Sequence, residues 1–298
     1  MEKKTRYYVR IVIGLVIIIL GVFLALLPWR QKNKNPDINI VGKFEAANFT
    51  RAVDLRGDAF AKCKGKMLGA VVPHHMVGGK FIADVFSQAH DIDTVVVIGP
   101  NHFEKGTSAV ITADSDWVTA KGTVPVDNDL IGGLVSNKIA SAQNEVISGD
   151  HSVGNIIPFI AYYLPSVKVV PIILKRDVPK DDFENLIQYL VAQQKVKRIL
   201  IVGSVDFSHY LSVQELEKMD SQTIKAIEDK NYSLISSFHE DNLDSPATVN
   251  AVLKVTDMLG SNKLLWQNSN SFKVLESDIN DTTSVSYTHL TLPTILRV

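Results

Sequence analysis

Short, continuous apolar runs alternate with amphipathic stretches along most of the chain. The runs are rich in valine and isoleucine and have the length of single strands: Met67 to Val72, Thr94 to Ile98, Val167 to Leu174 and Arg198 to Val202. A run that is apolar at every position predicts a strand buried on both faces, as parallel strands usually are. These four runs therefore predict the centre of a parallel sheet.

Amphipathic stretches with a helical period separate these runs. They are Gly79 to Ala89, Asp129 to Leu134, Asn155 to Tyr163, Asp181 to Gln193, Val213 to Ile227 and Ala247 to Leu259. Strands that alternate with helices predict crossover connections. The expected fold is α/β, with a central, mostly parallel sheet and helices on both faces. Residues 109–122 predict a hairpin off the main sheet, and residues 263–274 predict a late strand.

The longest apolar run lies at the N-terminus. Ile11 to Trp29 covers about 19 residues without a charge, the length that crosses a bilayer. The run is longer than the apolar part of a usual signal peptide, and no small-x-small cleavage site precedes Arg30. We therefore expect residues 1–30 to be an uncleaved transmembrane anchor and residues 31–39 to be a linker. Flanking basic residues slightly favour a single-pass protein whose main domain lies outside the cytoplasm.

The C-terminal segment needs separate treatment. Residues 285–294 read VSYTHLTLPT, which resembles one reading frame of a transposon-type sequencing adapter. We predict that residues 285–298 derive from such an adapter, and His289 is therefore excluded from the site. One α/β domain, residues 40–287, remains, since no internal repeat or second linker interrupts it.

Charge and cysteine content exclude some functions. The 298-residue chain has a formal net charge of -1 at pH 7, so no overall positive field attracts nucleic acid and no nucleic-acid partner is expected. The one cysteine, Cys63, has no second cysteine for an internal disulfide and precedes an apolar run, as a buried, inert thiol does. No sequence signal sets the oligomeric state. The chemistry must come from other side chains.

Histidines follow three of the four apolar runs, at His74, His102 and His209. In open α/β sheets, loops from the carboxyl ends of neighbouring strands converge and bind ligands. These three imidazoles are therefore expected to share one pocket. His151 lies in a predicted loop ahead of a helix, and its neighbour Asp150 can orient an imidazole.

Imidazole nitrogens bind iron, copper and zinc, and two histidines with one carboxylate leave coordination positions open for substrate and oxygen. Asp206 is a candidate acceptor that fixes the tautomer of a ligand histidine. Strand alternation directs His75 away from the side that His74 faces. His90 and His239 fall in helical stretches and are expected at the surface. The charged segment from Lys175 to Asp182 is expected to be a solvated loop and helix start.

At these motifs the chain resembles the Memo family, also called AmmeMemoRadiSam system protein B, whose fold is similar to that of the LigB-type class III extradiol dioxygenases. The resemblance runs from about Met67 to Tyr287. The matching residues are Pro73 and His74; Gly99 to His102; His151, Ser152, Pro158 and Phe159; and Asp206, Phe207 and His209. Asp150 and Gly154 stand where the family has glutamates, and Val205 stands where it has serine.

The resemblance implies a mononuclear metal site formed by the first two histidines and a later cysteine. This chain has no counterpart of that cysteine. Alignment of the helix at 247–259 with the family helix puts Asp244 in its place, and a slip of a few residues would make Asp241 or Glu240 the ligand instead.

Two functional hypotheses follow. In the first, the protein is a nonheme oxidoreductase of dioxygenase type in which His74, His102 and Asp244 hold Fe(II), with copper or zinc as alternatives. His209 and Asp206 would then handle a proton, and His151 would position the substrate or an oxyanion. In the second, it is a metal- or peptide-binding module without turnover, held at the membrane. A metal hydrolase ranks last, because the sequence has no dense set of acidic ligands.

Overall fold

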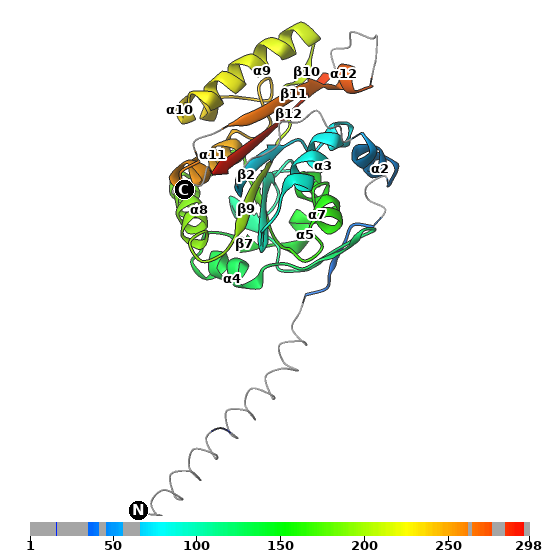
Figure 1. Ribbon diagram of the computed structural model, residues 1–298. Helices are drawn as coiled ribbons and strands as arrows, with labels where there is room; N and C mark the ends of the chain where they lie inside the picture. The colour runs from blue at the N-terminus through cyan, green and yellow to red at the C-terminus, as the bar shows by residue number, and fades with distance from the viewer. Residues whose placement is uncertain are drawn as a thin grey trace, which may run out of the picture. The chain divides into compact units, whose positions relative to one another are not determined.

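The four apolar runs form adjacent strands at the centre of a sheet in the computed structural model of the chain (Figure 1). They are β2 (Lys66–Val72), β3 (Thr94–Pro100), β8 (Lys168–Leu174) and β9 (Ile199–Ser204). Their order in the sheet is β2-β9-β3-β8, and each pair is parallel. All residues of β3 and β9 are buried, which explains why these runs lack polar alternation.

The structure describes Val16 and residues 35–41, 46–55, 66–261, 264–275 and 284–294. Contacts divide the chain into two compact units, residues 1–36 and 37–298. All the strands and helices named below belong to the second unit.

Antiparallel strands extend the parallel centre on both sides. β4 (Val110–Thr112) pairs antiparallel with β8 and also carries β7 (Ser141–Ala142). At the other side β12 (Ser284–Thr294) pairs antiparallel with β2, and β10 (His209–Leu211) and β11 (Leu265–Asn270) pair antiparallel with β12. The prediction of a mostly parallel sheet is therefore wrong, because the sheet is mixed. Short flanking strands such as β4 and β10 carry no long apolar run, so the sequence pattern does not reveal their direction.

A smaller sheet lies apart from this one. It contains β1 (Ile38–Asn39), β5 (Trp117–Thr119) and β6 (Gly122–Val124), in the order β1-β5-β6. β5 and β6 form an antiparallel hairpin, and Trp117 is fully buried. The predicted hairpin off the main sheet is thus present, but residues 110–112 of the predicted segment belong to the main sheet.

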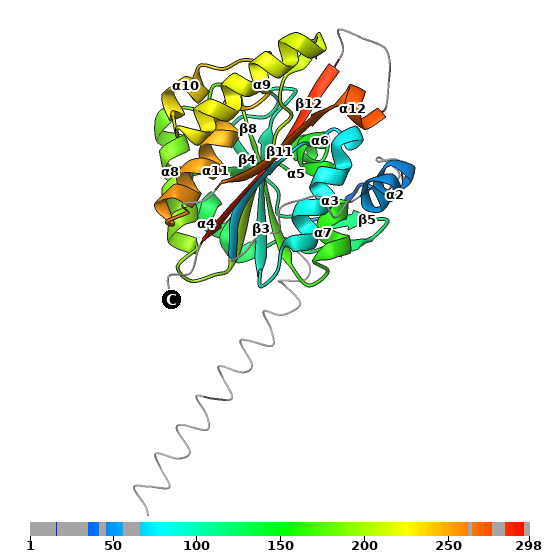
Figure 2. The same ribbon diagram turned by 45° about the horizontal axis from the view of Figure 1, so that its top comes forward.

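Helices cover both faces of the main sheet. Figure 2 shows α8, α10 and α11 on one side and α3, α6 and α7 on the other. The longer helices are α2 (Ala46–Asp54), α3 (Gly79–Gln88), α4 (Asn128–Ser136), α8 (Lys180–Gln193), α9 (Val213–Glu228) and α11 (Pro246–Met258). The short ones are η1 (Met76–Gly78), α5 (Asn144–Ile147), α6 (His151–Gly154), α7 (Ile157–Tyr163), α10 (Tyr232–Ser236) and α12 (Ser271–Leu275).

The predicted transmembrane helix, and the single-pass membrane location that follows from it, are corrected by the structure. None of the helices in the described ranges combines the length and the apolar composition that a bilayer crossing requires. The predicted span, residues 11–29, lies outside the described residues apart from Val16. The prediction rested on composition and run length alone.

The C-terminal segment from 284 to 294 is β12, whose backbone pairs with β2, β10 and β11. That residues 285–298 derive from an adapter stays a prediction.

Candidate metal centre

The histidines expected at strand ends lie at the carboxyl edge of the parallel centre. His74 follows β2, His102 follows β3, and Asp206 and His209 follow β9. β9 lies between β2 and β3, so the loops that carry these side chains are neighbours.

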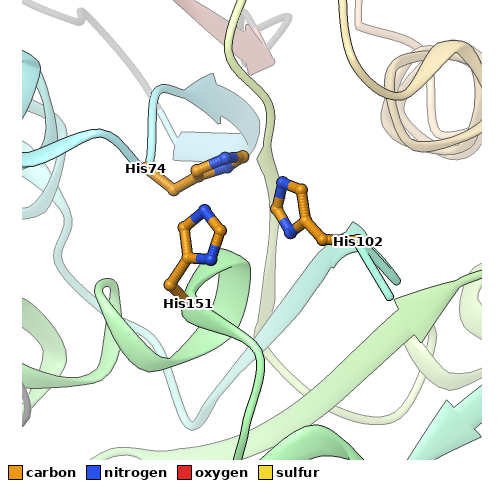
Figure 3. Close-up of side chains that lie close together, drawn as sticks. All are labelled: His74, His102 and His151. Atoms are coloured by element: carbon orange, nitrogen blue, oxygen red, sulfur yellow. The ribbon is translucent and has the colours of Figure 1, made fainter. Parts of the chain in front are cut away.

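His74, His102 and His151 converge from three segments of the chain (Figure 3). The ring centroids of His74 and His102 are 4.9 Å apart, and those of His74 and His151 are 5.1 Å apart. His102 and His151 stack at 4.2 Å, with 17° between their planes. The imidazole nitrogens of all three lie within 4.8 Å of one another, close enough to share an ion.

Asp244 meets two of these imidazoles. Its Oδ2 lies 3.3 Å from Nε2 of His74 and 3.8 Å from Nε2 of His102. The side chain of Ser245 caps α11 by accepting from the backbone N–H of Thr248, so Asp244 directly precedes a well-defined helix start. The backbone N–H of Asp244 also donates to the carbonyl of Asp206 at 3.1 Å. This ties the Asp244 loop to the loop that follows β9.

Glu240 and Asp241, the two acids that the sequence left as alternatives to Asp244, are both exposed. Glu240 Oε1 accepts from the guanidinium of Arg176 at 2.6 Å. Asp206 and Asp244, together with His74, form a second group whose ligand atoms lie within 4.8 Å of one another. The structure therefore contains a histidine and aspartate cluster that can hold a metal ion.

Asp150 orients His102. Its Oδ1 lies 2.8 Å from Nδ1 of His102, and its Oδ2 accepts from the backbone N–H of the same residue at 2.9 Å. Burial disfavours the charged form of His102, but hydrogen bonds to Asp150 and Asp244 outweigh it and raise the pKa of His102 to about 10. With Nδ1 held by Asp150, Nε2 faces Asp244, as a metal-binding nitrogen would.

Asp206 lies at the centre of the cluster and is almost fully buried. Its Oδ1 accepts from the backbone N–H groups of His74 and His75. Its Oδ2 lies 3.4 Å from Nε2 of His74 and 3.9 Å from Nε2 of His209. Burial alone would raise the pKa of Asp206, but the neighbouring His74 and His209 lower it, so that the carboxylate form is favoured.

His151 begins α6, where the Asp150 carboxylate accepts from the backbone N–H of Ser152 as the helix cap. His151 lies partly at the surface. The groups packed around its imidazole nevertheless displace water and lower its pKa, and His74 and His102 lower it further, to about 4. The neutral imidazole of His151 is thus available as a ligand or a hydrogen-bond partner.

Gly99 allows α6 to approach the end of β3. A Cβ at this position would lie 2.6 Å from Oγ and 2.7 Å from Cβ of Ser152. The Oγ of Ser152 donates to the carbonyl of Pro100, and the Oγ of Ser204 donates to the carbonyl of Ser152. Close contact between these backbones holds His102 and His151 at stacking distance.

We expect Gly99→Ala to destabilise the protein by about 1–3 kcal/mol, because the added methyl group overpacks a buried contact. Urea unfolding followed by circular dichroism measures this. Gly132→Ala is the matched control, because a Cβ at Gly132, within α4, meets nothing within 4 Å. This control should stabilise the protein by up to about 1 kcal/mol. Equal effects in the two variants would contradict the role assigned to Gly99.

The cluster opens into a cleft of about 510 Å³. His102, His209 and Asp244 line it, together with residues that the sequence analysis did not single out as site residues: Pro100, Asn101, Glu104, Leu174, Arg176, Asp177, Tyr210, Ser245, Pro246 and Ala247. Arg176 follows β8 at the same sheet edge as the histidines, so the strand-end argument that selected the histidines could have selected it too.

The remaining histidines are not among the described side chains that could share a metal ion. His75 is exposed, and its backbone N–H donates to Oδ1 of Asp206. His90 is exposed, with Nδ1 3.0 Å from the carbonyl of Gln88. His239 lines a second hollow of about 850 Å³ that shares Arg176, Glu240 and Asp244 with the first. The side chain of His289 lies outside the described residues.

Comparisons with known proteins agree with the motif pattern. The model of the family described as Memo-like protein matches residues 48–291. The chain is 30% identical over 205 residues to a MEMO1 family protein of Methanosarcina mazei, covering 67% of this chain and 74% of that protein. It is 28% identical over 193 residues to a MEMO1 family protein of Archaeoglobus fulgidus, covering 63% and 73%. It is also similar to the crystal structure of an uncharacterised protein from Escherichia coli K12, with a TM-score of 0.48 and 12% identity, covering 75% of this chain and 99% of that chain.

Proposed function

Because this chain belongs to the Memo-like protein family, we propose that it is a metal-dependent oxidoreductase of the nonheme Fe(II) dioxygenase type. One observation carries the proposal: Oδ2 of Asp244 lies 3.3 Å from Nε2 of His74 and 3.8 Å from Nε2 of His102, and His102 and Asp244 line an open cleft. Two histidines and one carboxylate are the ligand set that leaves positions open for substrate and oxygen. The likeness that the Memo family resemblance implies to the fold of LigB-type dioxygenases supports the same chemistry.

The donor atoms fit a first-row metal ion. Nitrogen and oxygen ligands lie about 2.0–2.2 Å from such ions, so neighbouring donors lie about 3–4 Å apart. The distances of 3.3 and 3.8 Å from Asp244 Oδ2 to the two imidazoles agree with this spacing. In addition, Oδ1 of Asp244 is buried without a hydrogen-bond partner among the described residues. A cation would compensate both this oxygen and the excess carboxylate charge of the cluster.

In this proposal His74, His102 and Asp244 hold the metal. Fe(II) would supply electrons for reaction with oxygen and a Lewis acid for a substrate oxygen. His209 lines the cleft, its side chain is 17% exposed, and its Nε2 lies 3.9 Å from Oδ2 of Asp206. It is therefore placed to accept a proton from a substrate hydroxyl, and Asp206 would stabilise the resulting imidazolium. His151 would orient the substrate or bind an oxyanion.

The test is anaerobic loading of the purified chain with Fe(II), followed by oxygen-electrode measurements on a panel of catechols. Stoichiometric iron with substrate-dependent oxygen consumption supports the enzyme. Failure to retain Fe(II), Cu(II) or Zn(II) would contradict the metal site itself.

We expect Asp150→Asn to weaken metal binding by about 10–100-fold, because His102 loses the carboxylate that orients its ring. Competition with a chelating indicator measures the change. Asp229→Asn is the matched control, since it removes an exposed carboxylate whose ion pair, among the described residues, is with the exposed Lys225. Unchanged affinity in Asp150→Asn would show that the orientation of His102 does not depend on this contact.

A non-catalytic metal- or peptide-binding module is the second candidate. The hollow next to the metal cleft favours it, because half-buried apolar side chains of Val178, Phe183 and Phe238 line that hollow. Such a surface can accommodate apolar side chains of a peptide. Metal retention without oxygen consumption on any catechol of the panel would favour this candidate over the enzyme.

A further inference from the structure

Tyr210 has a backbone conformation that large side chains rarely adopt. Its φ is +56°, in the left-handed region. Among the described residues, four other non-glycine residues have positive φ: Asp91, Glu104, Lys138 and Lys230. Lys138 and Lys230 directly follow the C-cap residues of α4 and α9, where this conformation is common. Aspartate tolerates it in loops.

The two residues left over, Glu104 and Tyr210, line the same cleft. Glu104 has a structural explanation, since its Oε1 accepts from the backbone N–H of Arg176 at 2.8 Å and so fixes the loop after β8. Among the described residues, the side chain of Tyr210 makes a ring contact with His209 but no hydrogen bond that would fix its backbone in the same way. Strained backbone concentrates at functional sites.

The strain arises from a β-bulge. The pairing of β10 with β12 shifts register between His209 and Leu211, which leaves Tyr210 as the extra residue. Glycine usually occupies the left-handed position of such a bulge, and bulges near active sites redirect a side chain. Here the bulge allows His209 and Tyr210 to line the same cleft, although consecutive residues of a regular strand point to opposite faces.

Tyr210 is 69% exposed although it lines the cleft. Its ring centroid lies 5.7 Å from that of His209, with 44° between the planes. His102 and Asp244, two of the proposed ligands, line the same cleft. A ligand that coordinated a metal there would share the cleft with this exposed aromatic side chain.

We propose that Tyr210 is a specificity-determining residue whose ring stacks on an aromatic substrate bound at the metal. The inference rests on the proposed function for the position of the metal. Aromatic rings gain from offset or edge contacts beyond the burial of area, so the ring should favour an aromatic ligand over an aliphatic one. The strained bulge is retained because it directs this ring into the cleft.

The experiment compares benzohydroxamate with acetohydroxamate, which coordinate a metal through the same group and differ in the phenyl ring. The chain is loaded with Zn²⁺, which is redox-silent, and both dissociation constants are measured by calorimetry for the wild type, Tyr210→Phe and Tyr210→Ala. The preference for benzohydroxamate should persist in Tyr210→Phe. It should fall about three- to tenfold in Tyr210→Ala, while acetohydroxamate affinity stays unchanged.

The possible failures are distinguishable. If neither hydroxamate binds the Zn²⁺-loaded wild type, the metal site fails and this inference falls with it. If both bind and the preference is the same in Tyr210→Ala, the inference about Tyr210 alone is overturned.

A stability measurement separates stacking from a structural role. Tyr210→Gly relieves the left-handed backbone and Tyr210→Ala does not, so the Gly variant should melt at a higher temperature than the Ala variant. The Gly variant should also lose the preference for benzohydroxamate. A Gly variant that melts below the Ala variant would overturn the inference, because the backbone at position 210 would then not be strained.

Discussion

Replacement of His102 by alanine is expected to reduce the metal content of the purified protein from near stoichiometric to background. Two effects combine in this variant. The ion loses an imidazole ligand, and Asp150 loses the partner whose Nδ1 lies 2.8 Å from its Oδ1. Asp150 is buried, and its pKa is about 2, because its hydrogen bond to His102 and the charge of that imidazole outweigh the effect of burial. Removal of the imidazole therefore leaves a buried carboxylate without its main partner.

The measurement is elemental analysis after loading with Fe(II) and desalting. His90→Ala is the matched control, since His90 is exposed and its imidazole contacts the carbonyl of Gln88, which is not a residue of the cluster. A melting curve of His102→Ala shows whether the chain still folds. A folded His102→Ala protein that retains metal at the wild-type level would remove His102 from the ligand set.

The second large effect concerns Asp244, which stands where the family resemblance places a cysteine. Asp244→Ala should lose the metal, because it removes the Oδ2 that faces both His74 and His102. Asp244→Cys should retain a metal but change the preference from Fe(II) toward Zn(II) and Cu(I), because thiolate is a softer ligand than carboxylate. The longer metal–sulfur bond, about 2.3 Å, partly offsets the shorter side chain.

Competition between Fe(II), Zn(II) and Cu(I), followed by elemental analysis, measures this change of preference. Asp241→Cys is the matched control, because Asp241 is exposed and lies in the same loop. A shift in Asp241→Cys with none in Asp244→Cys would assign the third ligand to Asp241. Equal metal content in the wild type and Asp244→Ala would contradict a carboxylate ligand at Asp244.

Strand β3 illustrates why much of the core was predictable. All residues of β3 are buried, so apolar or small residues are favoured at every position. The run from Thr94 to Ile98 has this composition. The same reasoning located β2, β8 and β9. It failed for β4 and β10, since a short or flanking strand can have either direction without a change in its residues, while most of β12 falls in the segment that was set aside as adapter-derived. That is why a mixed sheet was mistaken for a mostly parallel one.

The transmembrane prediction for residues 11–29 rested on composition. Composition reports only how favourably a segment would transfer from water to lipid. None of the helices among the described residues meets the requirements of a span.

The contacts within the metal cluster depended on tertiary structure. Asp150 and His102 are 48 residues apart in the chain, and the sequence did not specify which imidazole Asp150 would orient. His151 was expected near the site, but its stacking on His102 depends on the close approach of α6 to Gly99. The bulge at Tyr210 requires the pairing of β10 with β12, which no local pattern signals.

The amino-acid sequence by itself determined which runs are buried strands and which polar side chains follow them, because burial and chain direction act on each residue locally. Only the tertiary structure decided which of those side chains meet. Strand order places β9 between β2 and β3, and so brings Asp206 between His74 and His209. That order results from packing across the whole sheet, so it cannot be predicted from the sequence of any single segment.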